Sequence, residues 1–170
     1  LEMETLMVGA CVDFTYCRFE ESLDRNRRAV SLAEQVERPS VESHARYHLV
    51  LVLYAMGDSE EATQHASALM ESAERSGSRQ WQTFAMEANE NLSSARGDWQ
   101  TARDFAEQGL AMSPRQADLR GCRAILEYQT GNFEPGRAYL EQLLENVWPS
   151  PSSLAAFTTD TVPAVVIPLA

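Results

Sequence analysis

Apolar side chains recur along this chain at steps of three and four residues, the spacing that places them on one face of an α-helix. Before Gly57 and before Gly97, this face occupies the positions two, five, nine and twelve residues upstream of the glycine. The two sets are Ala55, Val52, His48, Ala45 and Ala95, Leu92, Ala88, Ala85. The periodicity predicts helices near residues 3–16, 19–37, 41–56, 59–76, 79–96, 99–112, 115–130 and 133–147.

A short turn pattern separates these segments and returns along the chain. It reads Ala-Met-Gly-Asp-Ser-Glu-Glu-Ala from residue 55, Ala-Arg-Gly-Asp-Trp-Gln-Thr-Ala from residue 95 and Gln-Thr-Gly-Asn-Phe-Glu-Pro-Gly from residue 129. A degenerate copy at Cys17 precedes Gly57 at the same spacing that separates Gly57 from Gly97, and Gly131 follows at a shorter one. Each glycine should end one helix in a left-handed conformation, and the Asp or Asn after it should cap the next. This period indicates an array of helical hairpins.

Short local patterns indicate where the paired helices meet, how they are capped and where each hairpin ends. Five residues after each turn residue comes a small side chain, which should let the paired helices approach closely: Ser22, Ala62, Ala102 and Gly136. Asp58 and Glu61 have the spacing of a capping box. The sequence from Ser113 to Gln116 offers an N-cap with Pro114 at the first helical position, and Pro39-Ser40 and Ser76-Gly77-Ser78 should separate hairpins.

The turns resemble the tetratricopeptide repeat in their Gly-Asp step, the aromatic Trp99 or Phe133, the small residue, an Ala-Leu-like pair and a closing Pro114 or Pro149. The similarity covers about residues 1–149 and implies an all-α solenoid of about four hairpins in a right-handed superhelix. The first helices lack the family's large aromatic and Leu-Gly pair, and two of the three spacings are 40 rather than 34. Units of this length resemble the repeat regions of large bacterial regulators, including ATP-dependent LuxR-type activators and related signalling proteins.

Residues 150–170 form an apolar, proline-containing tail. One further period from Gly131, of the length that separates Gly57 from Gly97, places the next turn just beyond residue 170. We therefore expect the chain to be a fragment and the tail to be the first helix of an unfinished repeat. Pro163 and Pro168 disfavour a regular helix there. We expect the tail to fray, extend or dock onto a neighbouring molecule, which would make it a route to self-association.

The formal net charge of −11 opposes direct binding to nucleic acid or to an anionic membrane surface. Three cysteines without CxxC spacing fit a reducing cytoplasm better than a disulfide framework. The sequence shows neither a leader nor an uncharged run of the roughly 18 residues that a membrane helix needs. We therefore expect a cytoplasmic protein.

Catalytic and metal motifs are missing from the sequence. His44 and His48 have the spacing of a zinc signature, but Ala45 occupies the place of the general-base glutamate. No phosphate-binding loop or nucleophile motif occurs. We expect no enzyme activity, no metal and no cofactor.

The first helix of each hairpin lines the concave groove in tetratricopeptide arrays, so the resemblance directs attention to the residues on that face. The candidate groove residues are Phe14, His44, Tyr47, Leu51, Tyr54, Phe84, Glu87, Asn91, Asp118 and Tyr128. Aromatic rings along a groove suit a peptide or helix, although the same rings could instead fill contacts between hairpins. Glu87 and Asp118 would favour a partner with basic residues.

The expected function is a non-catalytic module that binds a protein or peptide, as the interaction or effector-sensing part of a bacterial transcriptional or signalling regulator. Two alternatives remain open at this point. One is a stand-alone chaperone similar to those of type III secretion, and the other is a peptide-pheromone receptor.

Overall fold

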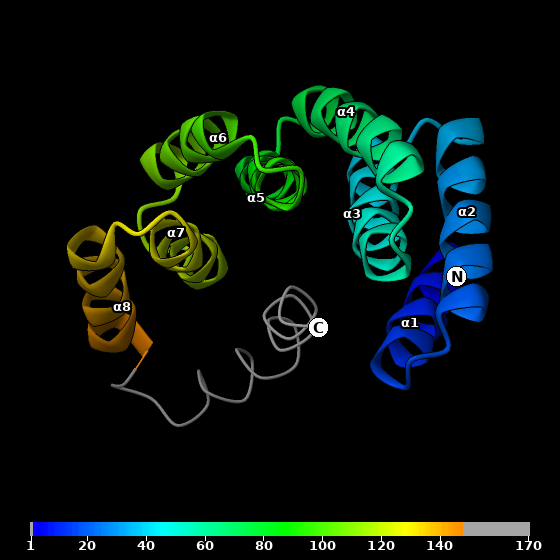
Figure 1. Cartoon of the computed structure of the whole chain (residues 1–170). Coiled ribbons are helices and arrows are strands. Elements are labelled where there is room, and N and C mark those ends of the chain that lie inside the picture. The colour runs from blue at the N-terminus through cyan, green and yellow to red at the C-terminus, as the bar shows by residue number, and fades with distance from the viewer. Residues whose placement is uncertain (1, 148–170) are drawn as a thin grey trace. The chain divides into compact units, whose positions relative to one another are not determined.

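The computed structural model describes residues 2–147, and in that range eight α-helices follow one another without any strand (Figure 1). They are α1 (Glu2–Thr15), α2 (Phe19–Gln35), α3 (Pro39–Met56), α4 (Ser59–Ser76), α5 (Arg79–Ala95), α6 (Trp99–Met112), α7 (Ala117–Gln129) and α8 (Phe133–Val147). The predicted all-α fold of successive helical hairpins is confirmed. The right-handed superhelix stays a prediction, and the proposed tail, residues 150–170, lies outside the described residues.

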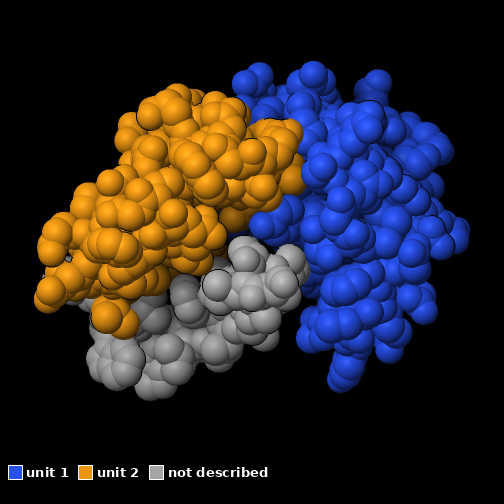
Figure 2. Space-filling model, viewed as in Figure 1, with its two compact units in different colours: residues 1–88 blue, residues 89–170 orange. Residues whose placement is uncertain are grey.

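The chain divides into two compact units, residues 1–88 and residues 89–170, with the boundary inside α5 (Figure 2). In unit 1, α1 pairs with α2 and α3 with α4, and α3 also contacts both helices of the preceding hairpin. In unit 2, α7 contacts α6 and pairs with α8. Within each unit these helices thus pack against their neighbours in chain order, which is how a helical repeat builds a core.

The turns recur at an interval half as long as the repeat. From residue 17 to residue 97, a left-handed residue follows every helix at an even spacing: Cys17 (φ 56°), Glu37 (φ 50°), Gly57 (φ 82°), Gly77 (φ 63°) and Gly97 (φ 75°). The next left-handed residue is Gly131 (φ 79°), after α7. The predicted glycine turns are confirmed, and Cys17 and Glu37 adopt the same conformation at a steric cost of roughly 1–2 kcal/mol each.

The predicted aspartate caps are present in both central hairpins. The Asp58 carboxylate accepts a hydrogen bond from the Glu61 amide at 3.1 Å, and the Asp98 carboxylate accepts one from the Thr101 amide at 3.4 Å. The capping box is only half formed, because the Glu61 carboxylate instead accepts hydrogen bonds from the Arg27 guanidinium at 2.6 and 2.7 Å. An arginine on α2 therefore outcompetes the reciprocal backbone contact.

Two predicted helix starts are wrong, and both involve proline. Pro39 lies in the first turn of α3 rather than in a linker, because its missing amide hydrogen has no helical partner there in any case. Conversely, α7 begins at Ala117, so Pro114 is not its first residue. The Ser113 amide donates to the Gly109 carbonyl, and the Gln116 amide donates to the Ser113 carbonyl, so this segment ends α6 and makes a turn.

Small side chains lie where the paired helices cross, as predicted. Ser22, Ala62 and Ala102 are fully buried at these positions. At Gly136 an added Cβ would lie 2.9 Å from the Cδ2 atom of Tyr128, closer than carbon atoms normally approach. An added Cβ would displace the Tyr128 ring and would lie 3.2 Å from the Ala124 carbonyl oxygen, so the close approach of α7 and α8 favours a glycine at this position.

Candidate partner-binding surface

Five rings gather on α3 and α5 within unit 1, and we call His44, Tyr47, His48, Trp81 and Phe84 the aromatic row. Tyr47 stacks on Phe84 and His44 stacks on Trp81, each pair with ring centroids 4.9 Å apart. Trp81 meets Phe84 edge to face at 5.5 Å, and His48 lies 5.0 Å from His44. All five side chains are half-buried, so each ring contacts its neighbours and still reaches the surface.

The row arises from a constant offset between successive first helices. His44 and Trp81 are 37 positions apart, and so are Tyr47 and Phe84. The same offset joins α1 to α3, where the Cys11 Sγ atom lies 3.6 Å from the His48 Nε2 atom. This offset is three positions shorter than the spacing of the turns at Cys17, Gly57 and Gly97. Each ring therefore contacts a residue that lies about one helical turn before its own equivalent position in the next first helix. The rings therefore fill contacts between hairpins as well as facing outward.

The row carries no charge at neutral pH. Burial lowers the pKa of His44, and burial together with the nearby His44 ring lowers the pKa of His48 to about 4. Both imidazoles are therefore neutral, and the surface they form with Tyr47 and Phe84 is apolar in character.

Glu87 corrects one expectation about this surface. Its side chain is buried, and its Oε1 atom accepts a hydrogen bond from the Tyr47 hydroxyl at 2.8 Å. It is therefore not an exposed acid that could attract a basic partner. The tyrosine one repeat earlier covers it and supplies a donor, so Glu87 fixes the position of the Tyr47 ring.

The other predicted residues of unit 1 have two kinds of surroundings. Leu51 and Tyr54 continue down α3 from Tyr47 and are half-buried. Phe14 instead packs on Phe19, with ring centroids 5.7 Å apart, across the turn between α1 and α2. Leu51 and Tyr54 extend the aromatic row, whereas Phe14 holds its own hairpin together.

Unit 2 contains the remaining three predicted residues. Asn91 and Asp118 are half-buried, and the Gln116 side-chain amide donates to Asp118 at 3.5 Å. Tyr128 is exposed and packs on Phe133, with ring centroids 5.9 Å apart, across the turn between α7 and α8. Tyr128 thus has the same place in its hairpin as Phe14 has in the first.

Sequence periodicity did not single out Trp81 or His48 as members of the surface. Trp81 lies outside the positions that repeat before each turn glycine. A helical step of three residues from Trp81 to Phe84 was the available signal that the two share a face.

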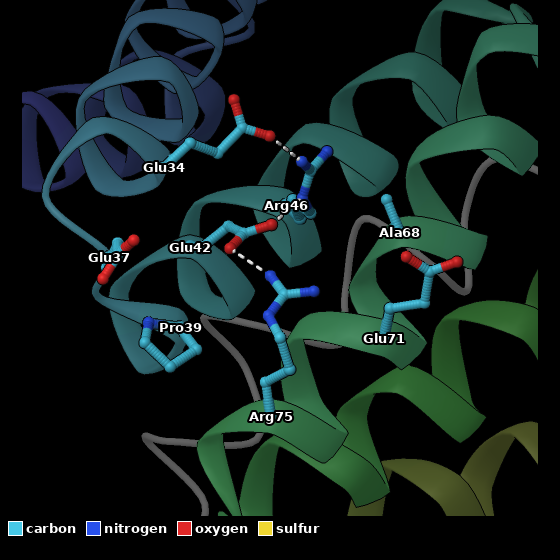
Figure 3. A pocket seen from close by; sticks show the side chains of 8 residues that line it. All are labelled: Glu34, Glu37, Pro39, Glu42, Arg46, Ala68, Glu71 and Arg75. Carbon is cyan, nitrogen blue, oxygen red and sulfur yellow. Dashed lines mark hydrogen bonds and ion pairs between the residues drawn. The ribbon is translucent and has the colours of Figure 1, made fainter.

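A second candidate site is a pocket of about 780 Å³ in unit 1, formed by α2, α3, α4 and the turn before α3 (Figure 3). Arg46 binds Glu34 and donates to Glu42 at 2.8 Å, and Arg75 on α4 donates to the other oxygen of Glu42 at 2.6 Å. Both guanidinium groups are thus already paired with carboxylates. This arrangement ties three helices together and favours a structural role for the pocket.

Within the described residues, no group of three or more His, Cys, Asp and Glu side chains could hold a metal ion. The helices between residues 2 and 147 include none with the length and apolar character to cross a membrane.

Comparison with known proteins adds no relative. No family model matches the sequence, and no curated protein matches it significantly. The structure alone defines the class: an all-α protein built from successive helical hairpins.

Proposed function

We propose that this chain is a non-catalytic, tetratricopeptide-like module that binds a protein or peptide through the aromatic row together with Leu51 and Tyr54. The observation that carries the proposal is the continuous set of half-exposed, uncharged rings on α3 and α5. Aromatic side chains give a large contact area for little loss of conformational entropy, and they are enriched among residues that dominate binding energy.

The fixed geometry of the row supports the same function. Tyr47 is held by Phe84 on one side and by Glu87 at its hydroxyl. A surface ordered before binding costs less entropy when the partner docks. A partner with an amphipathic helix or an extended apolar segment would fit, with its apolar side chains against the rings.

The net charge of the chain indicates which kind of partner it would bind. The acidic chain, with its formal net charge of −11, favours a partner whose apolar anchors are flanked by basic residues. Such binding should weaken as salt increases. The three free cysteines support a reducing cytoplasm as the site of action, and a bacterial transcriptional or signalling regulator is the proposed parent protein.

Peptide display against the immobilised chain tests the proposal directly. The sequence contains no lysine, so amine chemistry can attach it through its α-amino group alone, which leaves every side chain unmodified. Selected peptides would then be synthesised and their affinities measured by calorimetry against the parent chain and two variants.

Tyr54→Ala should weaken binding by about 1–3 kcal/mol, roughly 5- to 150-fold, with unchanged helicity. Val36→Ala is the matched control, because Val36 is an exposed apolar residue outside the row. Equal affinity of the parent chain and Tyr54→Ala for every selected peptide would refute the proposed surface.

A further inference from the structure

A pocket of about 600 Å³ in unit 2 has its walls on three successive helices, α6, α7 and α8, and on the turn after α6. Most of its lining is apolar and comes from Leu110, Ala111, Pro114, Pro135, Ala138 and Tyr139. Pockets of this size with apolar walls and a few polar groups are typical of sites for small molecules. The pocket shares no residue with the aromatic row, so a ligand here would be independent of the proposed function.

This pocket corresponds in position to the larger pocket of unit 1. Arg120 lines it and lies eleven residues before Gly131, just as Arg46 lines the other pocket and lies eleven residues before Gly57. Each pocket is formed by the second helices of two successive hairpins and the first helix between them in chain order. Each therefore places an arginine of that first helix against a cavity.

The two arginines differ in what surrounds them. Arg46 pairs with two glutamates of its own chain. The positions equivalent to those glutamates carry Pro114 and Gln116 in unit 2, and neither side chain can supply a carboxylate. The Arg120 guanidinium donates instead to the Pro114 carbonyl oxygen, and no carboxylate of residues 2–147 forms an ion pair with it. Arg120 thus keeps its positive charge uncompensated beside an apolar cavity.

The one glutamate that lines the pocket, Glu107, is occupied by another arginine. Its Oε1 atom accepts a hydrogen bond from the Arg123 Nη2 atom at 3.4 Å. Arg123 is buried, and its Cζ atom lies 5.6 Å from the centroid of the Tyr139 ring. Its Nε and Nη1 atoms are buried without a hydrogen-bond partner. Arg123 therefore holds Glu107, which leaves Arg120 as the lining cation that an outside ligand can reach.

We propose that this pocket binds a small carboxylic acid with an apolar body, such as a medium-chain fatty acid. Its carboxylate binds the Arg120 guanidinium, whose planar shape suits two parallel hydrogen bonds to a carboxylate. The ligand thus supplies the charge that glutamates of the chain supply to Arg46. Its hydrocarbon body contacts the apolar walls and removes their surface from water. The net charge of the chain opposes anions in general, so binding depends on this local pair.

Isothermal titration calorimetry of the full chain with octanoate tests the proposal, and octanamide is the uncharged ligand of the same length. Octanoate should bind at least about 10-fold more tightly than octanamide, because only the carboxylate forms a charge-assisted pair with Arg120. Arg120→Ala should weaken octanoate binding by a similar factor and leave octanamide binding unchanged. Arg120→Lys should recover part of the loss, since an ammonium group keeps the charge without the two parallel bonds.

Two further variants separate the pocket from the rest of the surface. Arg115→Ala is the matched control, because Arg115 is an exposed arginine close to Arg120 in sequence that does not line the pocket. It should leave octanoate binding unchanged. Ala138→Phe keeps every charge but fills part of the cavity from an exposed position on α8, so it should also weaken octanoate binding at least about 10-fold.

Circular dichroism checks the fold of each variant, and Arg120→Lys carries the comparison if Arg120→Ala unfolds the chain. Absence of octanoate binding at millimolar concentrations would overturn the proposal. Equal affinities for octanoate and octanamide would show that no cation anchors the ligand. Undiminished octanoate binding by both Arg120→Ala and Ala138→Phe would place the ligand elsewhere on the protein and would equally overturn the assignment of this pocket.

Discussion

Two buried glutamates of unit 2 should respond in opposite ways to the same substitution. Glu90 is 1 % exposed and Glu127 is 3 % exposed. Burial raises the pKa of Glu90 to about 8, and the hydrogen bonds from the Ser94 hydroxyl, at 3.3 Å, and from Cys122, with the charge of Arg123, offset this rise only in part. Glu90 is therefore protonated at neutral pH.

Glu127 has the opposite environment. Burial alone would raise its pKa, but hydrogen bonds from Arg103 and Asn132, with the charge of Arg123, hold the pKa below its ordinary value. The Arg103 Nε atom lies 3.1 Å from one carboxylate oxygen, and the Asn132 amide nitrogen lies 2.7 Å from the other. Glu127 is therefore ionised in the folded protein.

Glu90→Gln should stabilise the protein at neutral pH. The unfolded chain releases this proton near pH 4.5, whereas the folded chain keeps it up to about pH 8. The unfolded state binds fewer protons in this window, so the free energy of unfolding falls as pH rises, by about 1.4 kcal/mol per unit. By pH 7 the free energy of unfolding has fallen by about 3 kcal/mol, and Glu90→Gln should restore that amount because glutamine cannot ionise.

Urea unfolding followed by far-UV circular dichroism, repeated at several pH values between 4.5 and 8, measures this effect. Glu127→Gln is the matched variant and should destabilise by roughly 3 kcal/mol, because it leaves Arg103 and Arg123 partly unpaired in a buried site. A Glu90→Gln variant with unchanged or lower stability, and the same pH dependence as the parent chain, would show that Glu90 is ionised in the folded protein and that this reasoning is wrong.

Four further substitutions test other features of the fold by the same unfolding measurement. Glu37→Gly should stabilise by about 1 kcal/mol, because Glu37 has a left-handed φ of 50°; a loss of stability would contradict this account of the turn. His48 has a folded pKa of about 4 against an ordinary 6.5, so its contribution is complete above pH 6.5 and is lost as pH falls toward 4. His48→Gln should reduce that acid sensitivity, and an unchanged slope would count against a buried neutral ring. Arg46→Met should cost about 3 kcal/mol because it leaves the buried Glu42 carboxylate with Arg75 as its remaining cation. Arg75→Ala, at an exposed partner, should cost less than about 1 kcal/mol, and equal losses for the two arginines would refute the distinction.

The sequence predicted the helices closely because two independent signals coincide, a helical period in the apolar residues and a glycine after the first helix of the second, third and fourth hairpins. It failed at Pro39 and Pro114, since proline suits both the first turn of a helix and a linker between helices. The left-handed turn at Glu37 carries no glycine, so no local signal marked it as one of the series.

The surface was harder to predict than the helices, because periodicity within one helix does not give the offset between two helices. Tyr47 and Glu87 occupy equivalent positions ten residues before a turn glycine. Tyr47 is nevertheless half-exposed, whereas Glu87 is buried beneath the Tyr47 side chain. The stacking of Trp81 on His44 depends on the same offset. Such contacts become visible only when the packing of successive hairpins is known.

Because the left-handed residues are evenly spaced, a segment as long as one hairpin could be removed from this chain while the pattern of turns is kept. Excision of residues 18–57 would join Cys17 directly to Asp58, so a left-handed residue would still precede an aspartate cap. The main contacts of α1 to α4 join helices that are one or two places apart in chain order, so the remaining helices should meet faces of the kind they already pack against. We therefore expect the array to tolerate the loss or gain of one whole hairpin through in-frame recombination.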